Sequence, residues 1–166
     1  MNLRWRLSHT RGYLALGMLR EAEAELRAID PADQERREVA ELWLALFHAR
    51  GSWRKLEELA NKWVLREPEE VSWWVNLAYA ARRTSSVHRA HSILEQALMW
   101  HAGEAIVHYN LACYAAQLGW LEEARMRLGV AVDLDESFRE LARTDPDLAP
   151  LRREHPGKEA GPGDTC

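Results

Sequence analysis

The chain has 166 residues, 47% of them hydrophobic, and a formal net charge of −4 from 22 basic and 26 acidic side chains. The basic residues are dispersed among acidic ones, so the chain lacks the concentrated basic face of a general nucleic-acid-binding protein. Two cysteines, Cys113 and Cys166, are too few for a disulfide framework. No apolar run is long enough to cross a bilayer or to act as a signal peptide, so we expect a cytoplasmic protein with neither nucleic acid nor membrane as a partner.

Apolar residues recur at spacings of three and four along the chain, which is typical of amphipathic helices, and no segment alternates as a strand does. Pro31 and Pro68 fall between helices, and the hydroxyls of Ser52 and Ser86 are placed to cap the helices that follow them. Short connections make neighbouring helices antiparallel. The pattern predicts eight helices, at residues 3–16, 19–30, 34–49, 53–66, 71–83, 87–101, 105–117 and 121–134.

A period of 34 residues relates the small residues Gly17, Gly51, Ser85 and Gly119, each of which separates two predicted helices. Such a period marks stacked units that cannot bury their apolar faces alone. Glycine suits these positions because it accepts the left-handed conformation at a helix C-terminus, and Ser85 departs from this rule. We predict one domain over residues 3–153, with repeats at 3–34, 35–68, 69–102 and 103–136, an amphipathic capping segment at 137–153 and a disordered tail at 154–166.

The third and fourth repeats carry the clearest motif. The third supplies Trp74, Leu77, Ala78, Ala90 and Leu94, and the fourth supplies Asn110, Leu111, Ala112, Tyr114, Gly119, Ala124, Leu128, Ala131 and Asp135. In this the chain resembles the tetratricopeptide repeat family. The resemblance implies an all-α solenoid of antiparallel helix pairs, wound as a right-handed superhelix. It also implies that the first helix of each repeat lines a concave groove where a peptide or helix of another protein binds.

The register of that resemblance gives the residues expected to face the groove. We predict a partner-binding site at Arg11, His48, Tyr79, Arg82, Ile106, Tyr109 and Cys113. Its centre is expected at Tyr79, Arg82 and Tyr109, because aromatic residues and arginine are the usual anchors of interfaces. The alternative is that some of these side chains only pack against the next repeat. The basic residues with which some family members hold a chaperone's C-terminal carboxylate are missing.

Eight tryptophans are many for this length, and core packing is the expected role of most. Register places Trp63 and Trp74 in the core and Trp53 between repeats. It leaves Trp73 and Trp100 as candidates for an exposed patch.

No arrangement of residues indicates catalysis, so we predict a protein that is not an enzyme and has no cofactor. His88 and His91 are three apart on one helix and could share a metal with Glu95, but a surface pair without a metal is the stronger interpretation. His48 and Cys113 have nothing to orient them as base and nucleophile.

The leading hypothesis is therefore a scaffold or adaptor that binds another protein. The alternative is a self-assembling, chaperone-like homo-oligomer in which Leu3, Trp5 and Leu7 pack against a second copy.

Overall fold

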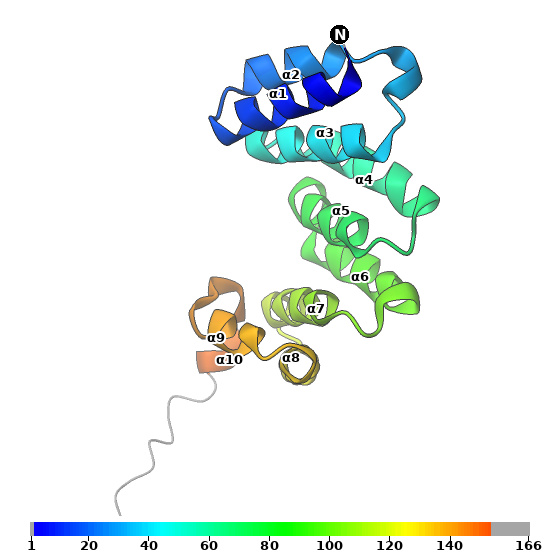
Figure 1. Ribbon diagram of the computed structural model, residues 1–166. Coiled ribbons are helices and arrows are strands. Elements are labelled where there is room, and N and C mark those ends of the chain that lie inside the picture. The colour runs from blue at the N-terminus through cyan, green and yellow to red at the C-terminus, as the bar shows by residue number, and fades with distance from the viewer. Residues whose placement is uncertain (1, 154–166) are drawn as a thin grey trace, which may run out of the picture. The chain divides into compact units, whose positions relative to one another are not determined.

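A computed structural model describes residues 2–153 (Figure 1). Over that range every regular element is helical, which confirms the predicted all-α fold class. The chain divides into two compact units, Met1–Thr84 and Ser85–Cys166. None of the described helices is both long and apolar enough to span a bilayer.

The first unit consists of five α-helices, with each helix packed against the next along the chain (Figure 1). Its second helix ends three residues earlier than predicted and its third begins three residues later. The reason is a 3₁₀ turn that starts at Pro31, where the carboxylate of Asp30 accepts a hydrogen bond from the Ala32 amide at 2.9 Å. The elements are α1 (Leu3–Ala15), α2 (Leu19–Arg27), η1 (Pro31–Asp33), α3 (Arg37–Arg50), α4 (Trp53–Arg66) and α5 (Val71–Thr84).

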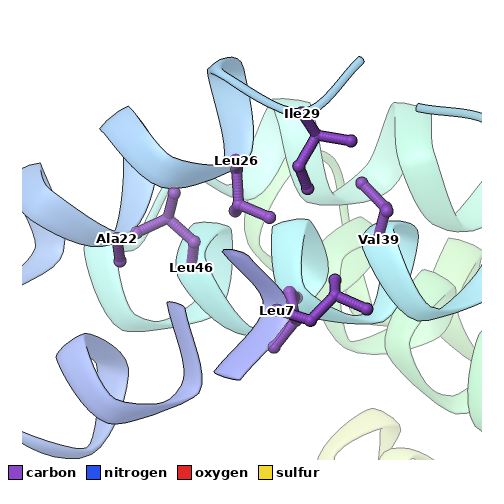
Figure 2. Packing of buried hydrophobic residues seen from close by; sticks show 7 residues of the cluster. Leu7, Ala22, Leu26, Ile29, Val39 and Leu46 are labelled. Atoms are coloured by element: carbon purple, nitrogen blue, oxygen red, sulfur yellow. The ribbon is translucent and has the colours of Figure 1, made fainter. Parts of the chain in front are cut away.

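The core of this unit forms where α1, α2 and α3 meet (Figure 2). Its members are aliphatic side chains that recur at helical spacing: Leu7, Ala22, Leu26, Ile29, Val39, Leu42 and Leu46. Further along, the rings of Trp63 and Trp73 stack with centroids 5.1 Å apart and join α4 to α5. Trp63 and Trp74 are buried as predicted, and Trp73 is buried as well rather than part of an exposed patch. Of the two tryptophans considered for an exposed patch, Trp73 and Trp100, only Trp100 is exposed.

The second unit is built around α7, which contacts α6, α8 and the segment that follows them. Residues 137–153, predicted to cap the repeats, form two short helices and a 3₁₀ turn that pack on α7 and α8. The elements are α6 (Val87–His101), α7 (Ala105–Leu118), α8 (Leu121–Leu134), α9 (Ser137–Thr144), η2 (Pro146–Leu148) and α10 (Ala149–Arg153). The predicted tail, 154–166, lies outside the described residues.

The turns between helices follow the small-residue period. Gly17, Gly51 and Gly119 have φ of +69°, +64° and +79°, which confirms the predicted left-handed conformation. Ser86 caps α6 by accepting a hydrogen bond from the Arg89 amide at 3.1 Å. The hydroxyl of Ser52 makes no such bond to α4, so that part of the capping prediction is wrong.

Candidate protein-binding site

Four side chains of the first unit form a partly exposed cluster where α3 and α5 end and α4 begins. The rings of His48 and Tyr79 stack at 5.1 Å, and the Trp53 ring meets both edge-on, at 5.7 and 5.6 Å. The Arg83 guanidinium lies 3.5 Å from the Tyr79 ring centroid and 4.7 Å from that of Trp53. We call these four residues the aromatic–arginine cluster.

The cluster is held in place before any ligand arrives. Arg83 also donates a hydrogen bond to the Tyr79 carbonyl at 3.2 Å. Ring pairs of this kind contribute about 0.5–1.5 kcal/mol each, and a cation over a ring contributes about 0.5–1 kcal/mol at an exposed site. His48 and Arg83 are nevertheless exposed, and Trp53 and Tyr79 are half-buried. A fixed, accessible surface of aromatic rings loses little side-chain entropy when it binds a partner.

A pocket of about 440 Å³ adjoins the cluster at the turn from α3 into α4. The left-handed backbone of Gly51 turns the chain here, and Thr84 also lines the pocket. Three basic side chains and no acidic one line this pocket, whose residues are Gly51, Ser52, Trp53, Arg54, Lys55, Arg83 and Thr84. We call it the basic pocket. The N-terminus of α4 adds the positive end of a helix dipole.

A second pocket, of about 480 Å³, shares Lys55 with the basic pocket. Its apolar lining comes from Leu59 and from the Trp43 and Phe47 rings, which lie 5.4 Å apart. Its polar rim carries both signs of charge, from Glu23, Arg27, Lys55, Glu58 and Lys62. Charged and apolar surfaces are thus adjacent on this unit.

The structure brings together two of the predicted groove residues of the first unit, His48 and Tyr79. Arg11 is exposed on α1, outside the cluster, and Arg82 is half-buried on α5. Trp53 and Arg83 were not among the predicted site residues. Arg83 directly follows Arg82 in the last turn of α5, and Trp53 was expected between repeats, so their positions in the period were the available signal.

In the second unit, Tyr109 and Cys113 face the capping segment. Tyr109 is 4% exposed, its hydroxyl donates a hydrogen bond to Asp145 at 2.7 Å, and its ring lies 4.7 Å from that of Phe138. Burial, with the Asp145 hydrogen bond, raises the pKa of Tyr109 well above its ordinary value. Cys113 is 3% exposed, with its sulfur 3.8 Å from Asp145. The chain itself covers this part of the predicted groove, because residues 137–153 fold back over α7; Ile106 is half-buried.

Candidate metal ligands meet between α6 and α8. The ligand atoms of His91, Glu95 and Glu123 all lie within 4.8 Å of one another, and the His91 ring contacts Glu123 at 2.9 Å. Arg127 already pairs with Glu95 at 2.6 Å and with Glu123 at 3.7 Å. His88, the other half of the predicted pair, packs against the Trp120 ring at 5.5 Å and is not part of this group. The three residues could hold a cation only after displacing the guanidinium.

No protein-family model and no curated protein sequence matches the chain. Among solved structures, TTC0263, a thermophilic TPR protein in Thermus thermophilus, has a TM-score of 0.69 at 19% identity. The match covers 91% of this chain and 81% of TTC0263. MamA AMB-1 has a TM-score of 0.64 at 17% identity, with 90% and 80% covered. MamA MSR-1 has a TM-score of 0.63 at 17% identity, with 92% and 87% covered. The chain therefore has the tetratricopeptide repeat fold, with about four repeats followed by a C-terminal capping segment.

Proposed function

We propose that the protein is a non-catalytic scaffold that binds a peptide or helix of another protein on the aromatic–arginine cluster. The observation that carries the proposal is the preformed stack of His48 on Tyr79, with Arg83 against the Tyr79 ring. Aromatic and arginine side chains dominate the energetics of protein interfaces, and these remain accessible to a partner.

The packing of Cys113 and His48, the two residues considered as nucleophile and base, supports a non-catalytic role. Cys113, a candidate nucleophile, is 3% exposed under the capping segment, where a substrate would have to displace folded chain to reach it. The His48 ring stacks on Tyr79 and meets the Trp53 ring edge-on. The fold of helix pairs also supports a role in protein binding.

The experiment is capture of partners by the immobilised wild-type protein, followed by titration calorimetry with the purified partner. We expect Tyr79→Ala to weaken binding by at least about tenfold, in line with truncation of an interface anchor. Trp100→Ala is the matched control, because Trp100 is a 57% exposed aromatic on α6, outside the cluster. Equal affinity of the wild type and Tyr79→Ala for a saturable partner would refute the assignment.

Self-assembly is the second candidate. Leu7 belongs to the core of the first unit and Leu3 packs against that core, so the expectation that they pack on a second copy is wrong, but other apolar side chains of this unit are exposed. Trp5 on α1 is 61% exposed, and Leu16 at the end of α1 is 75% exposed. If these form a contact between copies, sedimentation velocity shows a mass that rises with concentration, and Trp5→Ala lowers it. A constant monomer mass would remove this candidate.

A further inference from the structure

We propose that the basic pocket recognises an acidic segment of the partner, whose side-chain carboxylates pair with Arg54, Lys55 and Arg83. The inference rests on the proposed function and specifies the chemistry of the partner. It comes from the charge of the pocket, which is positive in a chain with a net charge of −4.

Many basic residues of the first unit are already paired with carboxylates of the same unit. Arg37 pairs with Glu41 and Glu70, Arg50 with Glu23, and Lys62 with Glu35. Each of these pairs lies within the first unit, so these cations already have carboxylate partners there.

By contrast, the ion pairs found within residues 2–153 include none for Arg54, Lys55 or Arg83. Arg83 is held by the Tyr79 and Trp53 rings, and Lys55 lies 5.9 Å from the centroid of Phe47. The nearby carboxylate of Glu57 accepts a hydrogen bond from Thr84 at 2.5 Å. The pocket therefore keeps three cationic groups available for carboxylates from outside.

The geometry suits a carboxylate on Arg83. Nη1 of Arg83 donates to the Tyr79 carbonyl, which leaves the Nε and Nη2 edge of the guanidinium to donate two parallel hydrogen bonds to one carboxylate. Stacking also fixes the guanidinium, which lowers the entropy lost on binding. Arg54 and Lys55, in the first turn of α4, supply positive charge for further carboxylates.

The adjoining apolar surface adds a second requirement. Lys55 also lines the pocket that contains Trp43, Phe47 and Leu59. A segment whose carboxylates occupy the basic pocket can therefore place a neighbouring apolar side chain against those rings. The preferred ligand combines glutamate or aspartate with a large aliphatic or aromatic residue.

A protein segment fits better than a nucleic acid. Nucleic-acid affinity depends on many phosphate contacts along an extended basic face, whereas three cations line this pocket and charges of both signs surround the apolar pocket. Single-stranded DNA is nevertheless included in the test as the competing polyanion.

The test uses fluorescence anisotropy with a dye-labelled, end-blocked peptide of alternating glutamate and leucine, titrated with the full chain. The same peptide with glutamine in place of glutamate and a labelled oligothymidine are the comparison probes. We expect binding of the glutamate peptide that weakens with added salt, and at least about tenfold weaker binding of the other two. Equal binding of the glutamine peptide, or tighter binding of the oligothymidine, would overturn the inference.

Charge-matched variants locate the site. We expect Arg83→Gln to weaken binding of the glutamate peptide by about tenfold or more. The double variant with Arg54→Gln and Lys55→Gln should have the same effect. Arg20→Gln is the control, because it removes one positive charge from an exposed position of the same unit outside the pocket. Circular dichroism melts confirm that each variant is folded. If the control weakens binding as much as Arg83→Gln, the effect is one of general charge and the inference fails.

The same variants separate this inference from the proposed function. If a captured partner is weakened by Tyr79→Ala but not by Arg54→Gln with Lys55→Gln, the scaffold proposal stands and the acidic-segment inference is wrong. If Tyr79→Ala leaves the affinity for the partner unchanged, the proposed function itself fails.

Discussion

The hydrogen bond from Tyr109 to Asp145 is expected to hold the capping segment closed over α7. Tyr109→Phe removes the donor hydroxyl and keeps the ring that packs on Phe138. A hydrogen bond to a charged group contributes about 1.5–3 kcal/mol. Asp145 is only half-buried, so water can partly replace the lost donor. We therefore expect the lower end of that range, about 1.5 kcal/mol, as the loss in free energy of closing the segment.

The thiol of Cys113 reports this opening directly. It is 3% exposed and lies 3.8 Å from Asp145, so a disulfide reagent can reach it only when the segment moves away. A change of about 1.4 kcal/mol alters an equilibrium about tenfold, so Tyr109→Phe should speed the reaction of Cys113 by roughly tenfold. The Cys166→Ser background leaves Cys113 as the only reactive thiol.

The matched control is Tyr79→Phe, which removes a hydroxyl from the first unit and should leave the rate of Cys113 labelling unchanged. An unaltered rate in Tyr109→Phe would show that this hydrogen bond does not hold the segment. A comparable acceleration in Tyr79→Phe would show that labelling follows global unfolding instead.

Gly119→Ala should lower the free energy of unfolding, measured by urea titration, by about 1–2 kcal/mol, because φ at this residue is +79°. Gly129→Ala should raise it by about 0.5–1 kcal/mol, because Gly129 lies within α8 and an added Cβ there meets open space. A neutral Gly119→Ala would contradict the role of the turn. Arg37 holds the pKa of Glu70 below its usual 4.5, so the stabilisation from this pair is complete above pH 4.5 and is lost as the pH falls through the lowered pKa. Thermal melts across that range should show a shallower acid decline for Glu70→Gln. Zinc should not shift the melting temperature of untagged wild-type protein but should raise that of Arg127→Gln, because the guanidinium no longer competes for Glu95 and Glu123.

Helices and turns could be predicted from the sequence because their signals are local. The apolar spacing and the 34-residue period located all eight repeat helices, and the glycine positions gave three left-handed turns. The largest boundary shift lies between α2 and α3, where Asp30 caps a 3₁₀ turn at Pro31–Asp33 and residues 28–30 and 34–36 on either side of it are not α-helical. Ser52 and Ser86 occupy equivalent positions before second helices, yet only Ser86 adopts the extended backbone that lets its hydroxyl cap.

The site was harder to predict because it depends on contacts between helices. Periodicity assigned His48 and Tyr79 to one face but could not show that Trp53, from the start of the next helix, completes the stack. It also favoured Arg82 over Arg83, although a difference of one residue rotates a side chain by about 100° around a helix. The cover over Tyr109 depends on where a short segment folds back, for which the repeat pattern holds no signal.

Hydrogen–deuterium exchange with and without a saturating, captured protein partner tests the scaffold proposal most directly. We expect slower exchange in the peptides that contain the ends of α3 and α5 and the start of α4, where His48, Tyr79 and Trp53 lie. Protection confined to other helices, with those peptides unchanged, would contradict binding at the aromatic–arginine cluster.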